Sequence, residues 1–254
     1  MSIHSESKST STLGELKSLF YVALFALAIR IFIIELFFVP TGSMKATILE
    51  NDYIFSTKYS YGYSKHSFPF SPDMFNDRIL ASKPKRGDIV IFRPPMNMEI
   101  RYIKRLIGLP GDKIQMINDT IYINDKAVER IEDGRFTDQA GQLYKKFKET
   151  LPSGISYNSY KLAQSANTNK YGNTGIFYVP SDKYFFLGDN RDESNDSRID
   201  LGFVPFENFI AKGQFILFST SELFWLDNKG IIENVTRIWP WIKSIRFNRI
   251  LKTI

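Results

Sequence analysis

The stretch that decides the fold is Tyr102-Ile103-Lys104-Arg105-Leu106-Ile107-Gly108-Leu109-Pro110-Gly111-Asp112. Residues 101 to 107 predict a β-strand, and residues 108 to 112 predict the sharp turn that ends it. The run Ile89-Val90-Ile91-Phe92 predicts a buried strand. Similar short runs predict strands at 53–55, 114–117, 121–123, 176–179, 184–187 and 215–218. Short strands separated by Gly and Pro turns indicate a mainly β fold built on an antiparallel sheet.

Residues 129 to 175 differ in composition from the rest of this body. They are rich in Lys, Asn, Ser and Gly and show no strong hydrophobic period. A long polar stretch without a clear pattern is typical of an insertion, so we expect an inserted lobe here, part of it mobile. Before the lobe, Asn118 and Asp119 predict the tight turn of a hairpin.

An apolar run, Leu19 to Val39, precedes the body. At helical rise it crosses about 30 Å of hydrocarbon, although Arg30 and Glu35 interrupt it. We predict one N-terminal transmembrane helix at 19–39, with a cytoplasmic tail at 1–18 and an extracytoplasmic domain at 40–254. A helix lying in the interfacial plane is the alternative. A cleavable signal peptide is disfavoured because no Ala-x-Ala site follows the run.

The composition of the 254-residue chain excludes several kinds of site. It has no cysteine, which rules out disulfides, cysteine nucleophiles and thiolate metal sites. Its two histidines are His4, in a polar tail, and His66. A Ser-His-Asp triad would therefore have to use His66, and a metal site built on several histidines has almost no material.

The net charge of +6 is distributed unevenly. After Glu233 the chain has no acid, and tryptophans and isoleucines alternate with basic residues, namely Arg237, Lys243, Arg246, Arg249 and Lys252. This mixture favours contact with a bilayer surface, where cations meet anionic lipid and indoles lie among the headgroups. A packed C-terminal helix is the alternative, and nucleic acid is the least favoured partner.

Ser43 is a candidate nucleophile. It lies in Val39-Pro40-Thr41-Gly42-Ser43-Met44, directly after the apolar run. Gly42 permits a turn that presents the Ser43 hydroxyl and N–H together, and the Thr41 hydroxyl is close enough in sequence to help form an oxyanion hole. A turn serine without chemistry is the simpler explanation of the motif taken alone.

Lys104 is the candidate base. As a free amine, with a pKa near 10.4, only about 0.4% of it would be neutral at pH 8. Burial among apolar neighbours lowers the pKa of a lysine and supplies the neutral amine that a general base requires. A solvated lysine on an edge strand is the ordinary alternative.

A third cluster, Gly188 to Arg198, mixes acids, asparagines and two arginines. Its alternating Asp and Asn resemble a calcium loop, but the EF-hand spacing is absent. The arginines favour a network of internal ion pairs instead. Such a loop could orient the Lys104 amine through a hydroxyl such as that of Ser194.

These motifs together resemble the bacterial type I signal peptidases, or leader peptidases, a family of serine-lysine dyad proteases. The resemblance rests on four ordered blocks: 40–44, 86–92, 102–112, and 188–197 with 202–205. It implies Ser43 as nucleophile, Lys104 as general base and Thr41 as donor to the oxyanion. It further implies that Ser194 orients the lysine. The residues that would support the loop are Asp189, Arg191, Asp196 and Arg198, and those that would line the substrate pockets are Met44, Ile48, Tyr102 and Ile103.

The resemblance also implies what the protein would act on and where. We expect a single-pass protein of the cell inner membrane, with its catalytic domain facing the periplasm. Its partners would be exported preproteins with signal peptides and the lipid bilayer, with no nucleic acid, metal or organic cofactor. The sequence departs from the family pattern at Ala46, usually Pro, at Glu193, often Asn, and at Thr41, often Ser.

Three other functions are weighed against this one. A Ser-His hydrolase would use His66, and a membrane-anchored scaffold would bind peptides without cutting them. A self-cleaving repressor with the same dyad would need an N-terminal DNA-binding region, and the apolar run takes that place.

Overall fold

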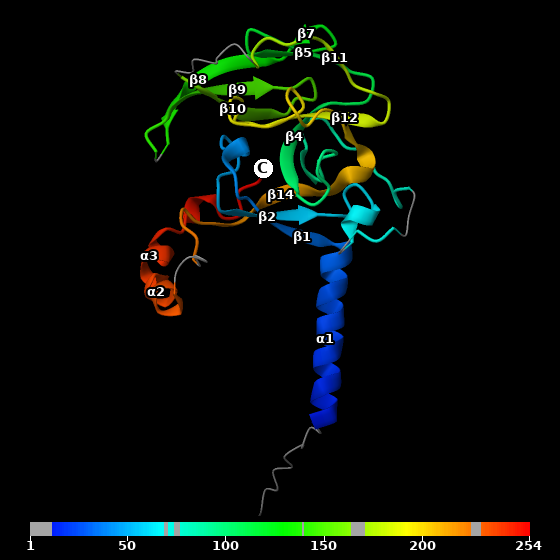
Figure 1. Cartoon of the computed structure of the whole chain (residues 1–254), viewed down its shortest axis with the longest axis vertical. Coiled ribbons are helices and arrows are strands. Elements are labelled where there is room, and N and C mark those ends of the chain that lie inside the picture. The colour runs from blue at the N-terminus through cyan, green and yellow to red at the C-terminus, as the bar shows by residue number, and fades with distance from the viewer. Residues whose placement is uncertain (1–11, 69–70, 74–76, 139, 164–170, 225–229) are drawn as a thin grey trace, which may run out of the picture.

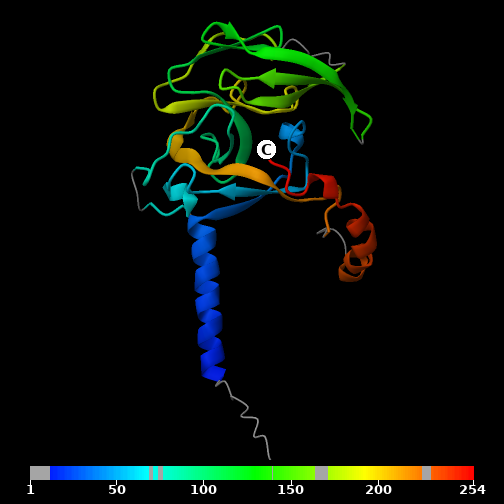
Figure 2. The ribbon, with the colours of Figure 1, turned by 180° about the vertical axis from the view of Figure 1, so that it is seen from behind.

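The structure is a computed structural model that describes residues 12–68, 71–73, 77–138, 140–163, 171–224 and 230–254. One long helix, α1 (Thr12–Phe32), projects away from a body made mostly of β-strands (Figure 1). The predicted mainly β, antiparallel fold is confirmed. Figure 2, from behind, shows the same projecting helix beneath the strands.

The largest sheet has seven strands in the order β1-β2-β14-β3-β4-β12-β13, and every adjacent pair is antiparallel. Its strands are β1 (Ile34–Phe38), β2 (Asp52–Thr57), β3 (Ile89–Phe92), β4 (Tyr102–Gly108), β12 (Lys183–Leu187), β13 (Val204–Pro205) and β14 (Phe209–Ser219). The predicted strands at 89–92 and 101–107 are therefore present as neighbours. Short helical turns η1 (Gly42–Met44), η2 (Lys65–Ser67), η3 (Phe206–Asn208) and η4 (Phe247–Arg249) lie in the connections.

A second sheet has the order β11-β5-β6-β7. It contains β5 (Lys113–Ile117), β6 (Thr120–Ile123), β7 (Lys126–Ala127) and β11 (Phe177–Tyr178). The hairpin predicted across Asn118 and Asp119 is confirmed, because Ile117 pairs with Thr120 and both turn residues have positive φ, 48° and 66°. Positive φ at both central residues is the geometry of the tight turns that suit twisted hairpins.

The segment predicted as an inserted lobe forms a third sheet, β10-β9-β8, which lies above the seven-stranded sheet in Figure 1. Its strands are β8 (Glu129–Thr137), β9 (Leu143–Thr150) and β10 (Ser156–Leu162). The sequence showed no period here because several inward positions are polar: Glu149 and Ser159 are fully buried. Residues 139 and 164–170 of the predicted lobe lie outside the described residues, so its expected mobility stays a prediction.

The predicted helix at 19–39 is wrong at its C-terminal end. The helix ends at Phe32, and residues 34–38 form β1, which pairs with β2 from Ile34↔Thr57 to Phe38↔Tyr53. Both halves of the run are apolar, so composition could not separate them, whereas strand pairing does. Among the described residues, no helix combines the length and hydropathy that crossing a bilayer requires.

The C-terminal segment forms α2 (Ile231–Thr236) and α3 (Ile238–Lys243) and contacts β14 of the main sheet through α3 and η4. Trp241 lies against Phe218, with ring centroids 5.8 Å apart. Arg246 and Arg249 both form ion pairs with the buried Asp52, at 3.2 and 2.6 Å. Arg237 also pairs with Glu222, at 3.5 Å, so three of the five basic residues predicted to face lipid are held by the protein itself.

Candidate active site

Ser43 lies in the short turn η1 between β1 and β2, and 8% of its surface is exposed. The backbone of the turn is tied to the loop after β12. Asn190 donates its backbone N–H to the Ser43 carbonyl at 3.1 Å and its side-chain Nδ2 to the Gly42 carbonyl at 3.0 Å. Gly188 completes this contact, because a Cβ there would lie 2.5 Å from the Ser43 carbonyl oxygen.

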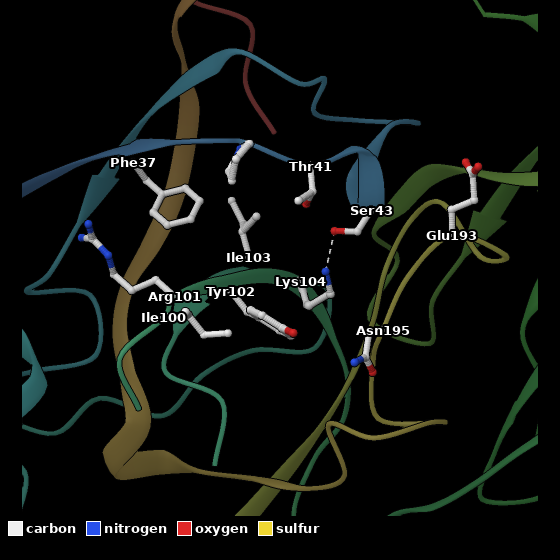
Figure 3. A pocket seen from close by; sticks show the side chains of 11 residues that line it. Phe37, Thr41, Ser43, Ile100, Arg101, Tyr102, Ile103, Lys104, Glu193 and Asn195 are labelled. Carbon is white, nitrogen blue, oxygen red and sulfur yellow. Dashed lines mark hydrogen bonds between the residues drawn. The ribbon is translucent and has the colours of Figure 1, made fainter. Parts of the chain in front are cut away.

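Lys104 reaches Ser43 from the neighbouring wall of the site. Its Nζ lies 2.5 Å from the Ser43 Oγ, with only 4% of the residue exposed (Figure 3). Strand β4 fixes this position, because Lys104 pairs with Val90 of the fully buried β3. The structure thus brings together two residues that are 61 positions apart in the sequence.

The surroundings of Lys104 favour its neutral form. Burial lowers the pKa of Lys104 to about 8, while the charges of Asp196 and Asp189 act in the opposite direction. Neither carboxylate is free to pair with the lysine. Arg198 binds Asp196 through two nitrogens at 2.9 and 2.8 Å, and Arg105 binds Asp189 in the same way at 2.8 and 2.7 Å.

A third buried pair lies behind the first two and comes from the lobe. Arg191 of the loop donates to Glu149 of β9, which also accepts hydrogen bonds from Tyr157 and Ser159, both at 2.7 Å. Arg130 of β8 also lies 3.4 Å from Glu149, so four arginines face the three carboxylates, whose charges are fully offset without Lys104. A protonated Lys104 would be one buried cation more than this network neutralises.

The predicted role of Ser194 is not visible in this geometry. Its Oγ is buried and has no hydrogen-bond partner among the described residues. A Cβ at Gly188 would lie 2.2 Å from that Oγ, so the hydroxyl packs against the loop backbone. The structure therefore places Ser194 at the site without a bond to Lys104.

A cleft of about 370 Å³ opens in front of Ser43 and Lys104. Three further residues predicted for the site line it: Thr41, Tyr102 and Ile103. The structure does not bring Met44 and Ile48 there. Both are fully buried in the core cluster that also contains Phe37 of β1 and Ile103 of β4.

The cleft also contains residues that the sequence interpretation missed, namely Phe37, Pro40, Ile100, Arg101, Glu193 and Asn195. In Figure 3 Phe37 and Arg101 lie toward one end and Glu193 toward the other, with the dyad between them. In the sequence, Phe37 lies shortly before the motif at 40–44 and Arg101 directly before the motif at 102–112. This proximity is the one sequence signal that could have pointed to them. Glu193 is held by Tyr144 of the lobe, whose hydroxyl donates to it at 2.7 Å.

Two strand edges border the cleft. β1 is the terminal strand of its sheet and pairs on one side only, with β2. Residues 102 to 104 of β4 pair with β3, whereas β12 begins to pair only at Arg105. Between these edges an extended peptide would find unpaired backbone donors and acceptors on both sides.

His66, the candidate base of the alternative triad, lies in another cavity. Its Nδ1 is 3.2 Å from the Ser71 Oγ, and it does not line the cleft that contains Ser43. Burial lowers the pKa of His66 to about 4, and the charges of Arg93, Lys65 and Arg78 act in the same direction. The geometry therefore gives Ser43 a lysine as its neighbour and not a histidine.

Comparison with known proteins agrees with these features. The family described as "Signal peptidase, peptidase S26" matches residues 13–218. The signal peptidase I of Rickettsia canadensis is 61% identical over 250 residues, covering 96% of this chain and 94% of the relative. That of Rickettsia bellii strain OSU 85-389 is 59% identical over 260 residues, covering 100% and 90%.

A crystal structure of a signal peptidase I from Enterococcus faecalis is 31% identical and covers 52% of this chain and 97% of its own. Its TM-score of 0.32 is too low for a comparison of folds. The family match and the two full-length relatives identify the chain. It belongs to the signal peptidase family, peptidase S26, and is a serine endopeptidase of that family.

Proposed function

We propose that this protein removes N-terminal signal peptides from exported preproteins, with Ser43 as nucleophile and Lys104 as general base. The observation that carries the proposal is the 2.5 Å contact between the Lys104 Nζ and the Ser43 Oγ at a buried site. The carboxylates behind the lysine already have arginine partners, which supports a neutral amine, the form that can accept a proton.

The reaction takes place in two steps. The Ser43 Oγ attacks the scissile carbonyl carbon while its proton passes to the Lys104 Nζ, and the resulting ammonium protonates the leaving amine as the peptide bond breaks. Water then attacks the acyl carbon while its proton passes to Lys104, and the ammonium returns that proton to the Ser43 Oγ as the ester bond breaks and the new carboxyl group of the cleaved fragment leaves. The Ser43 N–H and the Thr41 hydroxyl are the proposed donors to the oxyanion.

The substrate would bind as an extended strand between the edges of β1 and β4. Tyr102 and Ile103 on one side and Phe37 on the other offer shallow apolar contacts, which suit small side chains before the cleaved bond. Because α1 leads directly into β1, the end of the cleft lined by Phe37 is the end nearer the helix. The signal peptide would enter there, and the mature protein would leave past Glu193.

We further propose that the protein is attached to the cell inner membrane through α1, as a single-pass protein with its active site facing the periplasm. Apolar side chains are exposed all round the projecting part of this helix, among them Leu19 at 66% and Phe25 at 68%. Exposed apolar surface of this extent, on a helix that projects from the protein, indicates contact with lipid or with another protein. The apolar segment of a bound signal peptide would lie in the bilayer beside it.

The test is cleavage of a preprotein by the purified full-length protein, with mass analysis of the products. We expect Ser43→Ala and Lys104→Ala each to abolish cleavage at the signal-peptide junction, and Lys126→Ala, at an exposed position in β7, to leave it unchanged. Retained cleavage in either active-site variant would refute the dyad. Loss of cleavage in His66→Ala, with Lys104→Ala active, would favour the Ser-His alternative.

A further inference from the structure

A second cavity, of about 260 Å³, lies where helix α1 meets the body. Arg30 and Glu35 reach it from the end of α1 and from β1, Lys58 from the end of β2, and Arg93 from the end of β3. Arg101 lines both this cavity and the catalytic cleft. The chemistry proposed for the dyad makes no use of this cavity.

The cavity carries more positive than negative charge. Its lining includes four basic side chains, Arg30, Lys58, Arg93 and Arg101, but only two carboxylates, Glu35 and Glu99. Glu35 already serves two of the cations, since its oxygens lie 2.8 Å from the Lys58 Nζ and 2.5 Å from the Arg101 Nη1. In the described part of the chain, Arg30 and Arg93 form no ion pair.

Arg93 has unused hydrogen-bonding capacity at this site. Its Nε is buried and has no partner among the described residues, although one Nη donates to the Met98 carbonyl. Burial lowers the pKa of Arg93, and the neighbouring charge of Arg101 adds to that effect. The lowered pKa of His66, caused in part by Arg93, indicates the same positive potential. An anion that accepts hydrogen bonds would give the buried Arg93 Nε a partner and would offset the excess positive charge of the cavity.

The mouth of the cavity is apolar on the side of the helix. Phe32 packs edge-on against Tyr63 and Phe68, with ring centroids 5.9 and 6.0 Å apart. Phe32 and Ile33 remain 47% and 44% exposed, and they continue the exposed apolar surface of α1. Aromatic side chains at the end of a membrane-attached helix, as at the junction of α1 with the body, are typical of the interface between hydrocarbon and headgroups. A ligand with an anionic head and an apolar tail matches both surfaces.

We infer that this cavity binds the phosphate of a phospholipid headgroup, with Arg30 and Arg93 as the principal donors and the acyl chains lying along α1. The inference rests on the proposed attachment to the membrane. Because Arg101 is shared with the cleft, the bound phosphate would stand next to the entrance through which the signal peptide passes. Inorganic phosphate carries the same chemistry without the tail, so the experiment separates the two sources.

The experiment measures binding of phosphatidylglycerol to the full-length protein in phosphatidylcholine nanodiscs by native mass spectrometry. We expect Arg30→Gln and Arg93→Gln each to weaken binding about fivefold, and the double variant to combine both losses. The matched control is Arg135→Gln, which removes the same charge from an exposed position in β8 and should bind as the wild type does. Arg30→Lys with Arg93→Lys keeps the charge and should recover most of the binding.

Two results would overturn the inference. One is equal binding by the wild type, the control and the double variant. The other is displacement of the lipid by inorganic phosphate, which would assign the site to a soluble anion. If the double variant fails to fold, as thermal unfolding would reveal, Arg30→Gln alone carries the test, since Arg30 is exposed.

Cleavage of a short soluble signal peptide keeps this test separate from the proposed function. The double variant should cut it at the wild-type rate, because neither arginine lines the cleft. Lost lipid binding with intact cleavage supports the site, whereas bound lipid without any cleavage by the wild type would leave the lipid site standing and refute the peptidase proposal.

Discussion

Two lysines of this protein are equally buried, each with 4% of its surface exposed, yet their surroundings differ completely. Lys58 donates to a carboxylate of β1, Glu35, at 2.8 Å, and to the carbonyls of Arg30 and Ser67 at 3.1 and 2.9 Å. Lys104 forms no ion pair in the described part of the chain and meets the Ser43 hydroxyl instead. Burial alone therefore does not make a catalytic amine, because partners decide whether the charge is retained.

The two lysines also stabilise different things. The Lys58 ammonium binds a carbonyl in the last turn of α1, where a cation offsets the negative end of the helix dipole. It thereby joins the helix to the body. Lys104 is surrounded by acids that already have arginine partners, so its charge would gain little. The Lys58 ammonium therefore stabilises the fold, whereas Lys104 is placed where the neutral amine is favoured and can act as a base.

The largest effect that tests this comparison is on activity. Lys104→Met keeps the length and burial of the side chain but removes the amine, and we expect the cleavage rate to fall about 10²–10⁴-fold, which is the usual contribution of a general base. Single-turnover cleavage of a preprotein measures it. Lys58→Met should leave the rate of the folded enzyme within a few-fold of the wild type. Similar rate losses in Lys104→Met and Lys58→Met would mean that the two lysines do not differ in their contribution to catalysis.

The next effect is on stability, and the order of the two variants reverses. Lys58→Met leaves two helix-end and loop carbonyls without their donor and Glu35 with one partner fewer, so we expect unfolding to become easier by about 3 kcal/mol. Arg101 remains beside Glu35, which keeps the loss near the lower end of the usual range for a broken buried pair. Denaturant unfolding measures it. Lys104→Met should lose no stability at pH 7.

A third prediction concerns the pH dependence of stability. The folded pKa of Lys104, about 8, lies below its ordinary value of 10.5, so between these values the unfolded chain binds a proton that the folded protein does not. Its contribution to the free energy of unfolding therefore rises with pH across this window, by about 3 kcal/mol in all, and is smallest below pH 8.

Lys104→Met supplies the measurement for this third prediction, because the other titrating groups are the same in both proteins. The stability difference between wild type and variant should grow in favour of the wild type from pH 8 to 10.5. A difference that is constant with pH would mean that the folded pKa of Lys104 is not lowered.

The local features of this comparison could be predicted from the sequence. The strand that holds Lys104, the turn that holds Ser43 and the hairpin at Asn118 each depend on residues close together in the chain, where turn chemistry and apolar runs are informative. The spacing of the motifs and their resemblance to a family then pointed to the dyad. These elements needed no knowledge of distant contacts.

The features that escaped prediction depend on distant partners. Glu149 reads as an ordinary surface acid until β9 places it against Arg191. Glu35 reads as an interruption in a membrane helix, whereas pairing with β2 puts it in a strand beside Lys58. Met44 and Ile48 match pocket positions of the family, but the turn after Ser43 directs them into the core. In each case a long-range contact decided the role.

The smallest of the predicted effects tests the carboxylates nearest the base. Asp196 raises the pKa of Lys104 through its charge, so Asp196→Asn should lower that pKa further, and the unpaired Arg198 should act in the same direction. The acidic limb of the pH–rate profile should move to lower pH by about one unit, the usual effect of one nearby charge. Arg198→Gln removes the opposite charge and should move the limb to higher pH. Shifts of the same sign in both variants would mean that packing around the loop, and not charge, sets the protonation of the base.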